Sequence, residues 1–231
     1  GDRADVTAAQ QGPATTVVDL GGATMLPGFI DPHSHYINSL SVANQVNVFA
    51  PPAGPGADVD AIVTALRGFR DTHRIAPEDM LVAYGYDDTM MPGGRALSKE
   101  EVAADFTDIP VLVGHVSMHG AVLNSAALRK FDITADTVTP PGGVIVRKEG
   151  SDEPDGLVME TAFLPIFAAM PKPTPAQEVE WSRAGQMLYA AAGITTAHEG
   201  ASHAADIALM QRAATGGATL IDGVAYPFIL D

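Results

Sequence analysis

Short apolar runs alternate with amphipathic segments along most of this chain. Buried strands are indicated by three runs, which are MLVAYGYDD (80–88), IPVLVGH (109–115) and ITTAHEG (194–200). The segments between and around these runs are predicted to be helices, from the helical spacing of their apolar residues or from their helix-capping residues. They are 57–74, 98–106, 124–131, 174–193 and 203–214. Strands that alternate with helices predict βαβ units and a mostly parallel sheet.

The clearest helix signal covers residues 174–193. Thr174 is expected as the N-cap, Pro175 stands at the first helical position, Gln177 stands third, and Gly193 ends the segment. Two other segments predict β-structure of a different kind. Residues 16–20 are expected to form a short strand, and residues 139–160 read as a hairpin around the polar turn EGSDEPD.

Composition limits the classes of function. The 231 residues carry a formal charge of −15, which disfavours a nucleic-acid partner and an anionic membrane surface. Cysteine is absent, so a metal has to be held by His, Asp, Glu or a modified Lys. No apolar run approaches the ~20 residues of a membrane-spanning helix, and a cytoplasmic location is the expectation.

The most informative motif is the pair His33 and His35, which follows an apolar run. Alternate residues of a strand point to the same side, so both imidazoles are expected on one side at the carboxyl end of a strand. Active sites of parallel barrels lie at that end, and zinc accepts neutral imidazole ligands readily. The pair therefore predicts a divalent metal site, although a bare His-x-His also occurs by chance in exposed loops.

The segment PGFIDPHSHY (27–36) resembles the strand-one signature of the amidohydrolase superfamily. Four further segments, in the same order, resemble the amidohydrolase family 3 branch that includes N-substituted formamide deformylases. They are YGYDDTMMPGGRALSKEEVAADFTDIPVLV (84–113), SMHGAVLNSAAL (117–128), PPGGVIVRKEGSDEPDGLVMETA (140–162) and GITTAHEGA (193–201). The resemblance covers most of residues 15–201.

This resemblance implies an α/β fold, a (β/α)8 TIM-like barrel with a small β-sandwich domain, of which about the first half is present. Residues 1–26 would be part of the sandwich, and residues 27–231 the first half of the barrel, with a β-hairpin insertion at about 139–160. Four or five strand–helix units are expected. No histidine follows His203, so the remainder of the barrel would come from missing sequence or a companion chain. Assembly into a homo-oligomer stays open.

The resemblance also implies site residues. His33, His35 and Glu160 would be metal ligands, and Asp31 would support an imidazole by a hydrogen bond. His119 and His198 would take part in catalysis. Asn124 and Asp87 would bind substrate. Alternatives are a buried structural role for His119, a helix cap for Glu160 and solvated acids at Asp87.

Two further positions, His115 and Met118, bear on the predicted site. A structural role is favoured for His115. Met118 stands where the branch has glycine, which leaves the backbone freedom of that turn in question.

The resulting hypothesis is a metal-dependent hydrolase that cleaves a carbon–nitrogen bond, in an amide or an N-substituted formamide, by metal-activated water. The expected cofactor is zinc, as one or two ions, and the substrate is a small molecule. One alternative is a truncated or regulatory protein that keeps the scaffold without catalysis. Another is an unrelated α/β binding module.

Overall fold

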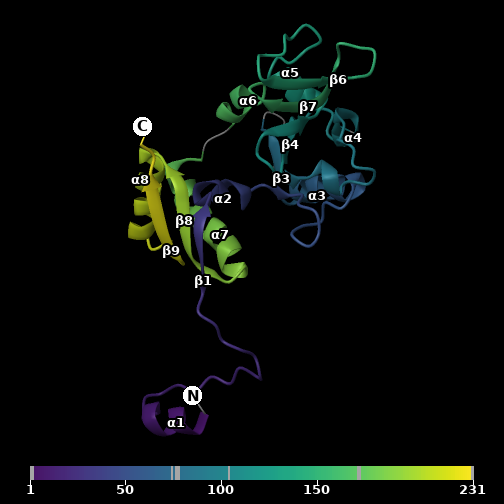
Figure 1. Cartoon of the computed structure of the whole chain (residues 1–231). Coiled ribbons are helices and arrows are strands. Elements are labelled where there is room, and N and C mark those ends of the chain that lie inside the picture. Colours follow the sequence, from purple (N-terminus) through teal and green to yellow (C-terminus); the bar gives the residue numbers. More distant parts are fainter. Residues whose placement is uncertain (1–2, 74, 76–78, 104, 171–172, 230–231) are drawn as a thin grey trace.

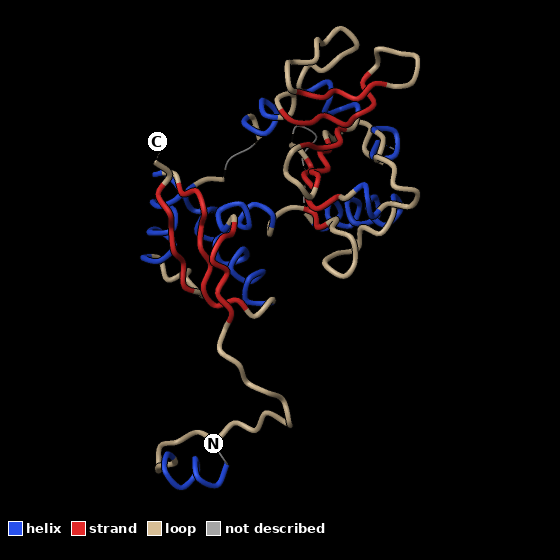
Figure 2. The backbone as a smooth tube through the Cα atoms, viewed as in Figure 1, coloured by secondary structure: helices blue, strands red, loops and turns tan. Residues whose placement is uncertain are grey.

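Two separate β-sheets organise the chain, as the ribbon and tube views show (Figures 1 and 2). The computed structural model describes residues 3–73, 75, 79–103, 105–170 and 173–229. One sheet has three strands and the other has six. The strands that the apolar runs predicted at 80–88, 109–115 and 194–200 are confirmed, but they do not share one sheet.

The three-stranded sheet is entirely parallel, in the order β1-β8-β9. Its strands are β1 (Phe29–Ser34), β8 (Ile194–Ser202) and β9 (Asp222–Pro227), and its helices are α2 (Tyr36–Val42), α7 (Pro175–Ala191) and α8 (Ala204–Thr215). The helices cover one face, where Ala197 of β8 packs with Tyr36, Leu40 and Leu209. The predicted capping box of α7 is confirmed, with Pro175 at its first position.

The opposite face of this sheet carries apolar side chains in solvent. Ile30 of β1 is in register with Thr196, and Val224 of β9 is in register with His198. Thr196 and His198 flank Ala197 in β8, so their side chains point away from the helices, as do those of their partners Ile30 and Val224. Ile30 is 62% exposed and Val224 is 38% exposed. We call this surface, with Phe29 and Tyr226, the open face.

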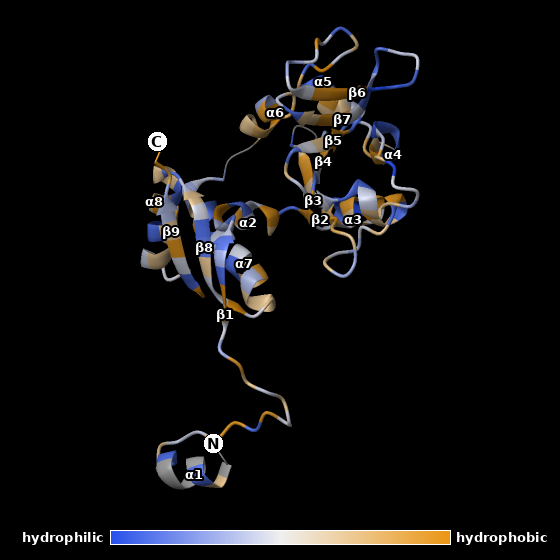
Figure 3. Ribbon diagram, viewed as in Figure 1, coloured by the Kyte–Doolittle hydropathy of each residue, from blue (hydrophilic) through white to orange (hydrophobic). Residues whose placement is uncertain are grey.

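The six-stranded sheet has the order β2-β3-β4-β5-β7-β6. Its strands are β2 (Val46–Asn47), β3 (Leu81–Tyr86), β4 (Val111–His115), β5 (Gly120–Leu123), β6 (Gly143–Arg147) and β7 (Pro154–Glu160). The first three run parallel, and the others pair antiparallel. Hydrophobic residues concentrate along its central strands (Figure 3).

Four α-helices and one 3-10 helix of the described residues accompany the six-stranded sheet. They are α3 (Val59–Thr72), the 3-10 helix η1 (Asp88–Met90), α4 (Lys99–Ala103), α5 (Ser125–Lys130) and α6 (Leu164–Ala168). Asp58 caps α3 by accepting a hydrogen bond from the N–H of Ala61. No helix within the described ranges is long and apolar enough to cross a membrane.

The barrel expectation is confirmed only as a mixed α/β fold, because the strands of the described residues do not close into a barrel. The strands expected as four or five successive barrel units divide between two sheets. β1, β8 and β9 are neighbours in their sheet, although all six strands of the other sheet lie between β1 and β8 in the sequence. The predicted hairpin forms as the antiparallel pair β6 and β7, but as part of that second sheet.

The N-terminal segment differs from its expectation in local structure. Residues 3–10 form helix α1 (Arg3–Gln10), and the predicted strand at 16–20 is not formed. Residues 10–30 are exposed, so no packing partner favours a strand there. The assignment of residues 1–26 to a sandwich domain stays a prediction, and its first two residues lie outside the described ranges.

Candidate functional site

His33 and His35 lie at the carboxyl end of β1, as the sequence predicted. His33 is in the strand, and His35 is the residue that precedes helix α2. Both side chains are exposed, and their ring centroids are 6.3 Å apart at an interplanar angle of 73°. Two accessible imidazoles side by side have the donor chemistry of a zinc site. Within the described ranges, neither belongs to a cluster of three metal-binding side chains.

Asp31 contacts the backbone of this segment. Its Oδ1 accepts a hydrogen bond from the N–H of His33 at 3.2 Å. The sequence had suggested a hydrogen bond to an imidazole, whereas the bond in the structure fixes the backbone just before the ligand pair. Asp31 therefore supports the strand end, by a different contact.

His198 lies on β8, next to β1, on the open face. Its Nδ1 is hydrogen-bonded to the hydroxyl of Tyr226 on β9, and the two rings meet edge to face. His198 and His33 thus belong to adjacent parallel strands of one sheet. The following residue, Glu199, is buried and accepts hydrogen bonds from the N–H groups of Ile37 and Ala201.

His119 and Glu160 lie in the other sheet, where the structure brings them together. The Nδ1 atom of His119 is 3.1 Å from Oε1 of Glu160, and both side chains are largely exposed. The pair sits beside α2, because Nδ2 of Asn38 on that helix donates to Sδ of Met118 at 3.5 Å. A buried structural role for His119 does not fit this exposure.

Met118 and Glu160 have left-handed backbone conformations, with φ of 66° and 55°. Such conformations are strained for residues other than glycine and concentrate at functional sites. Met118 therefore occupies the turn for which a glycine is better suited, as the departure from the family pattern suggested.

Asn124 is completely buried and fully hydrogen-bonded. Its Oδ1 accepts from the N–H groups of Val111 and Ala127, and its Nδ2 donates to the carbonyl oxygens of Phe106 and Ile109. No donor or acceptor of this side chain remains for a substrate. The geometry argues against the predicted substrate contact and assigns Asn124 to capping α5.

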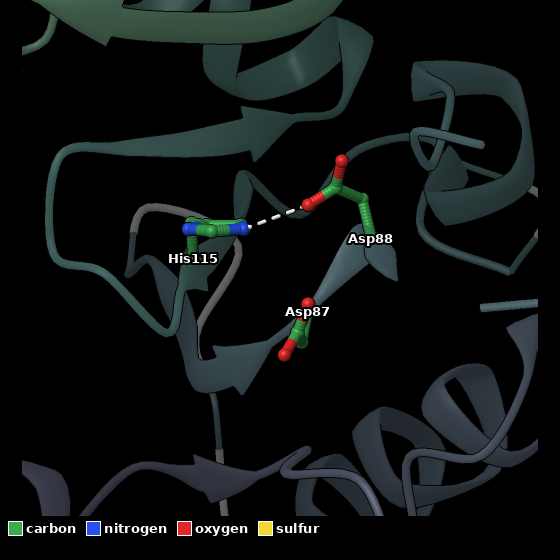
Figure 4. Close-up of side chains that lie close together, drawn as sticks. All are labelled: Asp87, Asp88 and His115. Atoms are coloured by element: carbon green, nitrogen blue, oxygen red, sulfur yellow. Dashed lines mark hydrogen bonds and ion pairs between the residues drawn. The ribbon is translucent and has the colours of Figure 1, made fainter. Parts of the chain in front are cut away.

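Asp87, Asp88 and His115 form a compact group at the carboxyl ends of β3 and β4 (Figure 4). One ligand atom from each lies within 4.8 Å of the others. Nε2 of His115 is 3.0 Å from Oδ1 of Asp88, and Nδ1 is 2.7 Å from Oγ of Ser117. The donor types suit a divalent cation, but these hydrogen bonds also hold the group by themselves.

Within this group, Oδ1 of Asp87 accepts hydrogen bonds from the N–H and hydroxyl of Thr89, and its binding of substrate stays a prediction. These bonds hold the pKa of Asp87 below its ordinary value. Asp88 and His115 were not predicted as site residues. The available signal was their position, since each follows a buried strand, and parallel strands end at the same edge.

The sequence of this chain matches a family model and several known proteins. The family model described as "Amidohydrolase family" matches residues 16–224. YtcJ of Bacillus subtilis, named as an amidohydrolase, is 32% identical over 159 residues, which are 69% of this chain and 28% of YtcJ. The N-substituted formamide deformylase of Arthrobacter pascens is 28% identical over 211 residues, or 89% of this chain and 38% of that protein.

The fold has a counterpart among solved structures. A metal-dependent hydrolase of unassigned role from Pyrococcus horikoshii matches with a TM-score of 0.55 and 17% identity. The match covers 87% of this chain and 36% of that one. This chain therefore spans roughly a third of the length of the proteins it resembles.

Proposed function

This chain belongs to the amidohydrolase family, and from that premise we propose that the protein is a metal-dependent hydrolase that cleaves a carbon–nitrogen bond of a small molecule. One observation carries the proposal. His33 and His35 are both accessible and adjacent at the carboxyl end of a parallel strand. An amide or an N-substituted formamide is the proposed substrate class, in keeping with the name of the Arthrobacter relative.

The residues present fit a divalent metal by their chemistry. Neutral imidazoles are good zinc ligands, and neither ring is blocked by neighbouring side chains. Two ligands do not complete a site, and the described residues place no third ligand in a group with them. The proposal therefore requires further ligands beyond His33 and His35.

The chemistry that such an ion supplies is a water of lowered pKa and a polarised substrate oxygen. The chain's own residues provide binding and orientation. His33 and His35 offer their ring nitrogens, and Asp31 fixes the backbone that carries them. His198, held through Nδ1 by Tyr226, faces the same open side of the sheet and is proposed to exchange a proton there through Nε2.

His119 and Glu160 are proposed to act as a second functional pair. The carboxylate beside Nδ1 orients the imidazole, as carboxylates do for catalytic and metal-bound histidines. Glu160 binds His119 rather than His33 or His35 in this structure. We therefore propose a role for Glu160 in holding His119, alongside the earlier hypothesis of a metal ligand.

A second candidate function is a non-catalytic protein that keeps the amidohydrolase scaffold. The observation that favours it is the incomplete ligand set around His33 and His35 in the described residues. This candidate and the hydrolase differ in the turnover they predict, because a non-catalytic scaffold hydrolyses no substrate whether or not it keeps a weak metal site.

The test is a double substitution, His33→Ala with His35→Ala, in the purified full-length enzyme. Bound zinc is measured by mass spectrometry, and hydrolysis is measured on a panel of amides and N-substituted formamides. The hydrolase predicts stoichiometric metal and turnover in the wild type, and loss of both in the variant. His115→Ala is the control that removes one imidazole from the Asp87–Asp88–His115 group. Metal retained by the double variant, or lost only from His115→Ala, would contradict the proposal.

A further inference from the structure

Three consecutive residues of β8 contact the segment that carries His33 and His35. The carbonyl oxygen of His198 accepts a hydrogen bond from Oγ of Ser34 at 2.8 Å. Ser34 lies between the two histidines in sequence and is in register with Glu199. The contact therefore joins the ligand segment to β8 at the point where β1 ends.

Glu199 fixes the chain just after His35. Its side chain is only 4% exposed, and its Oε2 accepts the N–H of Ile37 at 2.8 Å. Oε1 accepts the N–H of Ala201 at 3.2 Å, so both oxygens are used. His35 makes no side-chain capping bond to α2, and Glu199 caps that helix from the neighbouring strand instead. The start of α2, and with it the backbone of His35, is thereby held against β8.

Gly200 supports the ring of His33. A Cβ at position 200 would lie 2.9 Å from Cε1, 3.2 Å from Nδ1 and 3.3 Å from Nε2 of His33. All three distances are shorter than ordinary van der Waals contacts. Gly200 is not among the glycines with positive φ, so its backbone conformation does not require glycine. The requirement is the space that the imidazole occupies.

We propose that Glu199 and Gly200 are positioning residues that hold the His33–His35 pair in its metal-binding arrangement. Glu199 sets the direction of the backbone at His35, and Gly200 sets the position of the His33 ring. Neither residue needs to contact the metal. This inference rests on the proposed function for its purpose, while the contacts themselves can be tested without metal.

The first experiment substitutes Gly200→Ala and compares it with Gly68→Ala in the same protein. Gly68 is the matched control because a Cβ there meets no atom within 4 Å. In metal-free protein, we expect the imidazole NMR signals of His33 to shift in Gly200→Ala and to stay in place in Gly68→Ala. His33→Ala identifies those signals. Unchanged His33 signals in Gly200→Ala would overturn the role of Gly200, whether or not the protein binds metal.

The second experiment measures zinc affinity by competition with a chelator. Loss of a group that orients a metal ligand typically weakens binding about 10- to 100-fold. We expect a loss of that size in Gly200→Ala and in Glu199→Gln, and none in Gly68→Ala or in Glu180→Gln, which alters an exposed glutamate of α7. Thermal unfolding and the visible spectrum of the cobalt-substituted protein separate a displaced ligand from a damaged fold.

The outcomes distinguish the two proposals. Wild-type protein that binds no zinc through His33 and His35 refutes the proposed function, while the NMR comparison still decides whether Gly200 holds the ring. Zinc binding that depends on the histidines but is unchanged in Gly200→Ala and Glu199→Gln refutes positioning alone. A lower melting temperature with unaltered zinc affinity would give these residues a merely structural role and would also overturn the inference.

Discussion

The imidazole of His119 and the carboxylate of Glu160 face each other across the ends of β5 and β7, with Nδ1 3.1 Å from Oε1 and 3.2 Å from Oε2. The backbone N–H of Glu160 also donates to the carbonyl oxygen of His119 at 2.8 Å. The two residues are therefore joined through side chain and backbone, 41 positions apart in the sequence. Strained backbone at Met118 and Glu160 lies directly beside this contact.

Replacing Met118 with glycine should stabilise the protein. The left-handed φ of 66° costs a residue with a Cβ about 1 kcal/mol, and glycine adopts it without that cost. We expect Met118→Gly to raise the free energy of unfolding by up to about 1 kcal/mol, measured by urea titration. Met187→Gly is the contrast, because Met187 is an exposed helical residue of α7 and should lose about 1 kcal/mol. Equal losses in both variants would contradict this account.

Removing the amide of Asn124 should damage stability rather than substrate recognition. Asn124→Ala leaves two buried N–H groups and two carbonyl oxygens without their partner, which should cost about 3 kcal/mol of unfolding free energy. Asn44→Ala removes one hydrogen bond, to the carbonyl of Leu40, and should cost about 1 kcal/mol. A variant of normal stability with a raised KM would restore the substrate-binding role.

Acid should weaken the contact between Arg95 and Glu101. The guanidinium of Arg95 donates to both oxygens of Glu101 and, with hydrogen bonds from Ser98, lowers the pKa of Glu101 from 4.5 to about 2. A carboxylate with a lowered folded-state pKa stabilises the fold above pH 4.5, and this contribution is lost as the pH falls toward 2.

The Arg95 guanidinium is 55% exposed, so screening by solvent reduces this contribution. Arg95→Ala should therefore flatten the fall in stability between pH 4.5 and 2, measured by urea unfolding at several pH values. Glu180→Gln, in which the glutamate replaced is exposed, should keep the wild-type slope. Parallel curves for wild type and Arg95→Ala would argue against the ion pair.

The open face of the three-stranded sheet should bind hydrophobic probes. Ile30 is 62% exposed there, and exposed apolar side chains on a sheet favour association. Ile30→Ser should reduce the fluorescence of the dye ANS and the light scattering of the 231-residue chain. Met25→Ser replaces a side chain that is 82% exposed but lies outside the sheet, and should have little effect. Equal reductions in both variants would assign the binding to scattered apolar side chains.

Local signals in the sequence predicted local structure well. Thr174, Pro175 and Gln177 begin α7 as expected, because capping satisfies N–H groups within four residues of one another. Ser98 and Glu101 likewise form the expected capping contacts before α4. In each case the interaction is set by residues a few positions apart, so it can be read from the chain without knowledge of its neighbours in space.

Long-range pairing could not be read in the same way. An apolar run predicts a strand at 194–200, but not that its partner is Phe29–Ser34. The choice between one sheet and two depends on packing between segments far apart in the chain. The residues of the candidate site differ in the same way. His33 and His35 are neighbours in sequence and were predicted, whereas the support from Glu199 and Gly200 depends on strand pairing.

At Asn124 the local sequence predicted the structure correctly, whereas the family resemblance was misleading. The sequence predicts a helix over 124–131, which the structure has with Asn124 as its N-cap, while the family resemblance implied a substrate contact. Three of its four hydrogen bonds join backbone groups at 106, 109 and 111, which become its neighbours only after folding.

The pairing of β1 with β8 has a consequence for the order of folding. Ser34 and His198 are 164 positions apart, and closing a loop of that length in a flexible chain costs on the order of 4 kcal/mol of entropy. The six-stranded sheet lies within that loop, and its early formation would bring the two ends closer together and reduce this cost. During synthesis the strand that carries His33 must wait for Ile194–Ser202 to emerge, so the metal-binding pair is assembled late.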